Sequence, residues 1–337
     1  MRIGVVGLGY WGPNLVRVLN QSTKCTLAAV CDLDPSKLAK ITRQYPRVRG
    51  FLSVQELLTA DIEAVVVATS IGTHHAVAKQ ALEADKHVFV EKPLCDSSVK
   101  AKGLIGLADE RKVTLMTGHT FVYSPAVVRI KNLIDSAELG DVHYISCSRV
   151  NLGLYQKDVD VLWDLAVHDI SILLYWLEES PVEAASFGRS CVQNANNDVA
   201  FVWFQFPSGV IASCEVSWLS PQKLRRTCVV GSKRMVVWDD TQQDEKIKIY
   251  DRGVNVTMPS TFGEFQLTYR TGDMISPQLA NTEPLSVEMD HFVECCHSGA
   301  TPKTDGRFGL RVVQAMEMAA NRAWNTVSAV AAQAVGD

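Results

Sequence analysis

The chain has 337 residues, 47% hydrophobic and 21% charged, with a formal net charge of −4 and a sequence pI near 6.1. This length exceeds the size at which one hydrophobic core usually stops growing, so we expect two domains. The composition gives no basic surface for nucleic acid or an anionic membrane, and no apolar run could span a bilayer, so the expected partners are small molecules or other proteins.

The chain begins with the pattern of a dinucleotide-binding unit. Met1 leads almost directly into an apolar strand, "IGVV", rather than a secretory leader, so we expect a cytoplasmic protein. Gly7, Gly9 and Gly12 follow as G-x-G-x-x-G, and "NLVRVL" then has helical periodicity. The first glycine permits a tight turn, the second lets the backbone approach a pyrophosphate, and the third lets the helix pack against the strand. The alternative is a glycine-rich turn in an unrelated α/β fold.

A second apolar strand, "LAAVCD", ends at Asp32. A carboxylate at this position can bind both hydroxyls of an adenosine ribose, and it would repel a 2′-phosphate. The sequence therefore predicts NAD as the cofactor, with NADP less favoured.

Strands and helices continue to alternate up to residue 119. Three more buried strands read "EAVVVAT", "KHVFVE" and "VTLMTGH", separated by a helix from about His74 to Ala84 and by a helix reading "SVKAKGLIGLADERK". This alternation indicates a parallel sheet covered on both faces, whose ligands gather at the carboxyl ends of the strands. The predicted cofactor-binding residues at these ends are Gly7, Gly9, Tyr10, Trp11, Gly12, Asp32, Thr69, His74, Glu91 and Lys92.

Glu91, Lys92 and Pro93 end one of these strands with two opposite charges and a proline. A proline restricts the preceding residue to an extended backbone, which fixes where the lysine side chain points. Because this charged pair lies at the ligand-binding edge of a nucleotide fold, Lys92 is a candidate catalytic residue.

The second half of the chain has short β-rich runs at hairpin-like intervals between residues 141 and 251. A helical pattern interrupts them in "VDVLWDLAVHDISILLYWL", where Asp164 and His168 are four residues apart and therefore share one face. This pair suits acid/base chemistry, and the alternative is a helix-stabilising pair with a half-buried histidine. The nine cysteines are scattered, and Cys295-Cys296-His297 lacks further ligands, so we expect reduced thiols and no metal site.

These features together resemble the Gfo/Idh/MocA oxidoreductase family, named after glucose–fructose oxidoreductase and inositol dehydrogenase. The residues that carry the resemblance are the glycine motif, Asp32, "EKP" at Glu91–Pro93 and "WDLAVHD" at Trp163–Asp169. The resemblance continues in "EPLSVEMDHFVECCHSGATPKTDGRFGLRVVQAMEMA" near the end of the chain.

The resemblance implies an α/β protein of two domains. Residues 1–121 would form an N-terminal Rossmann domain, and residues 122–337 a C-terminal α/β domain with a large, mostly antiparallel open sheet. The closing helices, at about 285–333, would pack back on the N-terminal domain. One sheet face would line the substrate site and the other would support a homodimer or homotetramer.

The resemblance also implies an NAD-dependent dehydrogenase that moves a hydride between a sugar or cyclitol carbon and the nicotinamide. Removing the hydroxyl proton needs a base, and His168, with an ordinary pKa of about 6.5, needs little tuning for this. We therefore expect His168 as the principal acid/base with Asp164 beside it, while Lys92 binds and polarises the reacting oxygen. The alternative from another class is a non-catalytic NAD(H)-binding sensor.

Three segments resemble the nucleotide-sugar branch of the family: "SRVNLGLYQKDVDVLWDLAVHD", "GHTFVYSPAV" and "SWLSPQKLRR". Relatives in that branch oxidise the 3-hydroxyl of UDP-N-acetyl-hexosamine derivatives for surface polysaccharides or unusual sugars. Val167 and Asp160 stand where the branch has Pro and Asn. The basic run Lys223–Arg226 suits a diphosphate; a dehydrogenase of free sugars or inositols, the other enzyme hypothesis, would not need it. The predicted substrate-binding residues are Lys92, His119, Tyr123, Arg149, Asn151, Asp164, His168 and Arg225.

Overall fold

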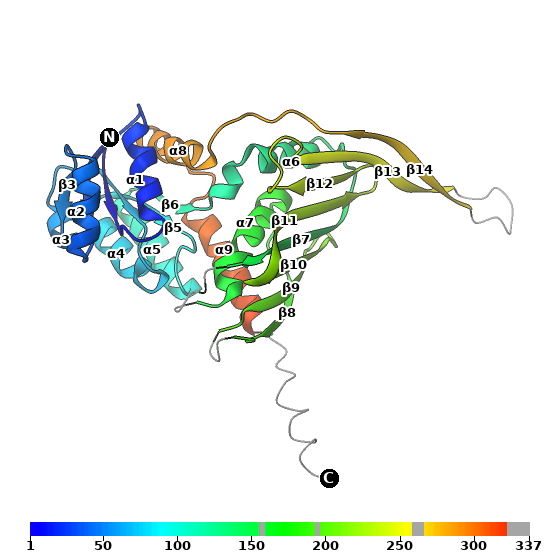
Figure 1. Cartoon of the computed structure of the whole chain (residues 1–337), viewed down its shortest axis with the longest axis horizontal. Helices are drawn as coiled ribbons and strands as arrows, with labels where there is room; N and C mark the ends of the chain where they lie inside the picture. Colours follow the sequence, from blue (N-terminus) through cyan, green and yellow to red (C-terminus); the bar gives the residue numbers. More distant parts are fainter. Residues whose placement is uncertain (154, 156–158, 193–195, 258–265, 322–337) are drawn as a thin grey trace, which may run out of the picture. The chain divides into compact units, whose positions relative to one another are not determined.

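The computed structural model describes residues 1–153, 155, 159–192, 196–257 and 266–321 (Figure 1). The chain forms two compact units. Met1–Ser124 joins Asn281–Glu317 in the first, and the described part of Pro125–Ala280 joins Met318–Asn321 in the second. Among the described residues, no helix is long and apolar enough to cross a membrane.

The first unit is built on a parallel sheet. Its described strands are β1 (Arg2–Val6), β2 (Thr26–Cys31), β3 (Arg49–Phe51), β4 (Ala64–Val67), β5 (His87–Glu91) and β6 (Leu115–Gly118). They lie in the order β3-β2-β1-β4-β5-β6, and neighbouring strands are parallel. The order reverses where β1 pairs with β4, and ligands of such sheets bind at the strand ends beside this reversal.

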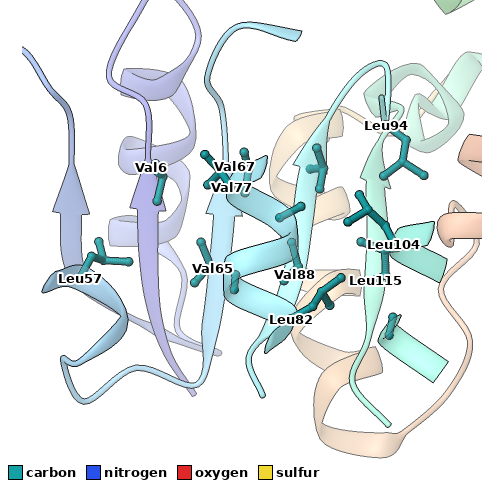
Figure 2. Packing of buried hydrophobic residues seen from close by; sticks show 14 of the residues in the cluster. Val6, Leu57, Val65, Val67, Val77, Leu82, Val88, Leu94, Leu104 and Leu115 are labelled. Carbon is teal, nitrogen blue, oxygen red and sulfur yellow. The ribbon is translucent and has the colours of Figure 1, made fainter. Parts of the chain in front are cut away.

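Helices follow these strands and share an apolar core with them. Figure 2 shows part of this core. In it, Val65 and Val67 of β4 and Val88 of β5 pack with Val77 and Leu82 of the helix that connects these two strands. The strands are near-continuous apolar runs, as expected where a parallel sheet is buried on both faces. The helices between the strands are α1 (Gly12–Gln21), α2 (Pro35–Gln44), α3 (Val54–Leu58), α4 (Ile71–Glu83) and α5 (Ser98–Arg111).

Helix α4 begins at Ile71, so the predicted start near His74 is wrong. Ser70 holds the N-cap position with an extended backbone, and the Thr73 hydroxyl donates to the Ser70 carbonyl. The first turn of α4 contains glycine and polar residues in addition to Ile71, and these obscure the helical period of apolar residues in the sequence.

Two C-terminal helices, α8 (Pro284–Ser298) and α9 (Gly306–Asn321), begin in the first unit. Phe292 of α8 packs edge-on against Phe89 of β5 with ring centroids 5.7 Å apart. The segment between the helices runs along β6, where the Thr117 N–H donates to the Thr304 carbonyl at 2.8 Å. The C-terminal segment thereby covers the last strand of the parallel sheet.

The second unit is built on a mostly antiparallel sheet. Its described strands are β7 (Val142–Leu152), β8 (Glu183–Arg189), β9 (Val199–Gln205), β10 (Ile211–Ser217), β11 (Leu219–Gly231), β12 (Met235–Asp239), β13 (Ile247–Thr257) and β14 (Gln266–Ile275). They lie in the order β14-β13-β12-β11-β7-β10-β9-β8, and among these described strands only β7 and β10 pair in parallel. The predicted fold class, a Rossmann sheet and a second, mostly antiparallel sheet, is confirmed.

Helical segments pack on one side of this second sheet: α6 (Pro125–Asp135), the π-helical turn η2 (Leu162–Ala166) and α7 (Val167–Leu177). Trp176 of α7 contacts Trp238 of β12 edge-on, with ring centroids 6.4 Å apart, and its indole N–H donates to the Val127 carbonyl of α6. The sequence predicted a regular helix from Leu165. This prediction is wrong at its start, because the first turn is π-helical. π-Turns inside helices occur often at functional sites.

Candidate active site

The glycine loop has the geometry of a phosphate cradle. Gly7 has φ +98°, and a Cβ there would lie 2.5 Å from the Ala68 carbonyl oxygen. A Cβ on Gly12 would lie 2.0 Å from the Gly7 carbonyl oxygen, whereas nothing lies within 4 Å of the Cβ position of Gly9. The first and third glycines are thus needed for packing, and the second keeps open space beside the start of α1.

The Asp32 carboxylate is fixed by the backbone around it. The Leu8 N–H donates to Oδ2 at 2.6 Å, and the Asp34 N–H donates to Oδ1 at 2.9 Å. Each carboxylate oxygen retains further acceptor capacity, which fits a ribose diol. The loop and this acid together fit NAD.

Glu91 is a buried acid at the end of β5, with 8% of its surface exposed. Its Oε1 accepts a 2.8 Å hydrogen bond from the indole N–H of Trp11, which lies in the glycine loop. Burial raises the pKa of Glu91 to about 7, against the opposing effects of the Lys92 charge and the hydrogen bonds from Lys92 and Trp11. Tyr10, beside Trp11, is exposed.

Lys92 is half-buried directly after β5, and its peptide bond to Pro93 is cis. The buried ring of His74 contacts the backbone of the next residue, since its Nδ1 lies 2.9 Å from the Pro93 carbonyl oxygen. Its Nε2 lies 3.1 Å from the Thr69 carbonyl oxygen. Burial lowers the pKa of His74, and a neutral ring can donate to one of these two acceptors at a time. His74 therefore joins the ends of two neighbouring strands, β4 and β5.

His119 and Tyr123, both predicted to bind substrate, lie inside the first unit. His119 is 1% exposed, and its ring nitrogens have no hydrogen-bond partner among the described residues. Burial and the charge of Lys92 lower the pKa of His119 to about 3, so its ring is neutral. The Tyr123 hydroxyl lies 3.1 Å from Thr304 Oγ1.

Asp164 and His168 lie on η2 and α7, and both are half-buried. The Trp218 indole N–H donates to Asp164 Oδ2 at 3.1 Å. The side chain of Asp160 accepts from the Trp163 N–H at the start of the turn, and burial raises the pKa of Asp160. A π-turn bonds residues five apart, so the segment that carries Asp164 and His168 is not a regular α-helix throughout.

Arg149 and Arg225 differ in their surroundings. Arg149 is 4% exposed, and its guanidinium donates to the buried Asp169 carboxylate at 2.7 to 3.1 Å. Arg225 is half-buried and lies 3.5 Å from Asp240; burial first, and Arg149 second, lower the pKa of Arg225. Asn151 is half-buried on β7. Arg149 therefore has an internal partner, while Arg225 and Asn151 retain exposed surface.

Asp169 and Glu288 were not identified from the sequence. Asp169 follows His168 directly, but its partner Arg149 lies on a distant strand. Glu288 of α8 is fully buried, accepts from the Thr120 hydroxyl at 2.6 Å, and burial raises its pKa well above the ordinary value. Glu288 stands at helical spacing from the buried residues Leu285 and Phe292. That spacing was the signal in the sequence that could have identified it as a buried acid.

Metal ligands are not clustered in the part of the chain that the structure describes: no group of three or more His, Cys, Asp or Glu side chains could hold an ion.

Comparison with known families connects both units to one group of enzymes. A model of an oxidoreductase family with an NAD-binding Rossmann fold matches residues 1–119, and a model of the GFO/IDH/MocA C-terminal domain matches residues 127–237. The chain belongs to the Gfo/Idh/MocA oxidoreductase family. This Gfo/Idh/MocA protein is an NAD-binding oxidoreductase that acts on CH–OH groups, so the predicted cofactor and enzyme class are confirmed.

Relatives of known activity are similar over nearly their whole length. UDP-N-acetylglucosamine 3-dehydrogenase of Acidithiobacillus ferrooxidans is 28% identical, covering 94% of this chain and 95% of the relative. Inositol 2-dehydrogenase of Rhizobium meliloti is 23% identical, covering 92% and 93%. Both are dehydrogenases of small hydroxyl-bearing molecules.

Two solved structures have the same fold. UDP-N-acetylglucosamine 3-dehydrogenase GnnA from Acidithiobacillus ferrooxidans has a TM-score of 0.80 at 28% identity, covering 96% of this chain and 97% of that chain. GenD2 from gentamicin A biosynthesis, in complex with NAD, has a TM-score of 0.80 at 25% identity, covering 96% and 94%.

Proposed function

We propose that this enzyme oxidises the 3-hydroxyl of a nucleotide-linked sugar of the UDP-N-acetyl-hexosamine type, in surface polysaccharide or unusual-sugar biosynthesis. The observation that carries the proposal is the 28% identity to a UDP-N-acetylglucosamine 3-dehydrogenase over 94% of the chain. The retained Lys92, Asp164 and His168 supply the side chains that such a reaction needs.

The reaction breaks a C–H and an O–H bond and forms a C=O bond. Bound NAD supplies the hydride acceptor. His168 takes the hydroxyl proton, since a neutral imidazole is a competent base near neutral pH. Lys92 binds and polarises the reacting oxygen, and Asp164, whose carboxylate is held by the Trp218 indole, lies on the same helical segment as His168. Of the cofactor residues predicted above, Tyr10 and Thr69 belong to the proposed NAD site.

A nucleotide-linked substrate carries a diphosphate, and β11 carries the matching charge. Lys223 and Arg226 are exposed, and half-buried Arg225 lies 3.5 Å from Asp240. Arginine and lysine suit anionic oxygens. We therefore assign Arg225 of this basic run to the diphosphate.

The test is a turnover screen with purified protein, NAD and a panel of UDP- and dTDP-sugars, free sugars and inositols. Reduced nicotinamide is followed by fluorescence, with and without 2-oxoglutarate as an alternative hydride acceptor, and products by mass spectrometry. We expect a UDP-N-acetyl-hexosamine to lose two hydrogens. Turnover of free sugars alone would contradict the proposal.

An inositol or free-sugar dehydrogenase is the second candidate. The 23% identity to an inositol 2-dehydrogenase over 92% of the chain favours it. The two candidates separate at β11: Arg225→Ala raises the KM of a UDP-sugar about tenfold, because a phosphate contact is lost. The same variant leaves the KM of an inositol unchanged.

We further propose that the protein is a cytoplasmic homodimer or homotetramer. Exposed aromatic side chains on the second sheet support this, including Phe187 and Phe201, which face each other across β8 and β9, and Tyr144 on β7. Light scattering of the purified protein tests it, and Phe201→Glu is expected to lower the measured mass. A monomeric wild-type protein would contradict the proposal.

A further inference from the structure

The Trp11 side chain links the dinucleotide loop to the strand end that carries Lys92. Trp11 is 38% exposed, so part of its ring is open to solvent while its indole N–H donates to Glu91 Oε1 at 2.8 Å. The other oxygen of the same carboxylate, Oε2, accepts from the Lys92 N–H at 3.3 Å. One carboxylate therefore contacts both the glycine loop and the backbone of the proposed catalytic lysine.

The position of this carboxylate is built into the sheet. Gly118 of β6 pairs with Glu91 of β5, and a Cβ on Gly118 would lie 3.2 Å from Glu91 Oε1. The same Cβ would lie 2.8 Å from Cζ of Phe89, so any side chain at 118 would crowd both neighbours. The glycine leaves the space that the carboxylate occupies.

The presence of a carboxylate at this buried position calls for an explanation. A glutamine side chain could also accept a hydrogen bond from the indole, and burying it would cost less desolvation free energy. The titratable groups around Glu91 are Lys92 beside it, Glu288 of α8 and His119 after β6. Burial favours the neutral forms of both Glu288 and His119, since it raises the pKa of Glu288 well above its ordinary value and lowers that of His119 to about 3. Among these groups, Lys92 is therefore the cation that an ionised Glu91 would stabilise by its charge.

We propose that Trp11 is a positioning residue for Lys92, acting through its hydrogen bond to Glu91; this inference rests on the role of Lys92 in the proposed function. The indole holds the carboxylate in place and favours its ionised form. The ionised carboxylate in turn stabilises and orients the lysine ammonium that binds the reacting oxygen. Trp11 lies in the loop that binds the dinucleotide, yet its effect falls on the chemical step.

The test is Trp11→Phe, which keeps an aromatic ring and removes the N–H. We expect kcat to fall about tenfold, because a hydrogen bond to a charged group is lost, while the Kd of NAD stays within about twofold. Losing a bond to the ionised form raises the pKa of Glu91 above its wild-type value of about 7. Because activity is lost as Glu91 is protonated, the acidic limb of the kcat profile moves to higher pH.

The pKa of Glu91 is read directly, without substrate, by NMR of protein labelled with ¹³C at the glutamate carboxyl, with Glu91→Gln identifying the signal. Glu288→Gln is the matched control: it replaces a second buried carboxyl, which accepts from the Thr120 hydroxyl and not from Trp11, so kcat and the pH profile stay at wild-type values. In a Glu91→Gln background, Trp11→Phe has no carboxyl to titrate, so it leaves the limb of the pH profile unmoved.

Two results would overturn the inference. One is an unchanged Glu91 pKa and wild-type kcat in Trp11→Phe while Lys92→Ala is inactive. The other is a loss of NAD affinity as large as the loss of kcat, which makes Trp11 a cofactor contact. Full turnover in Lys92→Ala is a different outcome, because it removes the proposed role of Lys92 itself, whatever the NMR titration of Glu91 shows.

Discussion

The first unit presents its candidate groups at the ends of parallel strands, whereas the second holds them on a π-turn and within an antiparallel sheet. In the first, Asp32 directly follows β2 and Glu91 ends β5, and backbone N–H groups donate to both carboxylates. In the second, Arg149 of β7 finds its partner, Asp169, on α7. Backbone N–H groups thus help to position the first set of groups, and side-chain partners position the second.

The two units also treat buried charge differently. Glu91 is buried with one cation at its side, and its pKa rises to about 7. Arg149 and Asp169 are buried as a pair with multiple hydrogen bonds. A charge whose protonation can change near neutral pH suits chemistry, and a fully paired charge suits structure.

The strongest test of this comparison removes one proposed proton-handling group from each unit. We expect Lys92→Ala and His168→Ala each to lower kcat about 10³-fold, since a polarising cation and a general base are lost. NAD affinity stays near the wild-type value in both, as measured by calorimetry. Wild-type turnover in either variant would remove that residue from the mechanism.

Asp169→Ala sharpens the contrast between paired and titrating charges. Leaving Arg149 buried without its partner costs about 3 kcal/mol in the free energy of unfolding, measured by urea denaturation. Asp109→Ala is the control, because it breaks an exposed pair with Arg307 and costs less than about 1 kcal/mol. Equal costs for the two variants would show that the buried pair is not structural.

Gly12→Ala separates packing from binding within the glycine loop. The new Cβ meets the Gly7 carbonyl oxygen, so we expect a loss of about 2 kcal/mol in the free energy of unfolding. Gly9→Ala enters open space, so it leaves stability within about 0.5 kcal/mol and weakens NAD binding instead. The reverse pattern would contradict the roles given to the two glycines.

Asp32→Ala gives the smallest expected effect. Removing the carboxylate raises the Kd of NAD about tenfold, since hydrogen bonds to the ribose hydroxyls are lost. The Kd of NADP falls relative to that of NAD, because a 2′-phosphate no longer meets a negative charge. Binding is measured by calorimetry with both dinucleotides; an unchanged ratio would remove Asp32 as the selecting residue.

Much of the first unit was predictable from the sequence because its signals are local. Apolar runs with glycine and acid at their ends identified β1, β2, β4, β5 and β6. Short β3 has three residues, two of them exposed, and gave no apolar signal. The bond between Trp11 and Glu91 was invisible because the two residues are 80 positions apart.

The second unit was less predictable. Strand β11 begins at Leu219, so the basic run Lys223–Arg226, which the sequence linked to a diphosphate, lies within a strand. Its pattern is broken by Pro221 and by three basic residues, which conceal the strand period. Strand β14 (Gln266–Ile275) is polar along much of its length and was missed for the same reason. Which sheet face each side chain occupies depends on register with distant strands.

The most direct test of the proposed function uses UDP-N-acetylglucosamine with deuterium at carbon 3. The protein is incubated with this substrate and NAD, and the reduced nicotinamide is examined by mass spectrometry. We predict that the reduced cofactor carries one deuterium and that a 3-keto nucleotide sugar accumulates. Reduced cofactor without deuterium, or an unreacted sugar beside rapid oxidation of an inositol, would contradict the account.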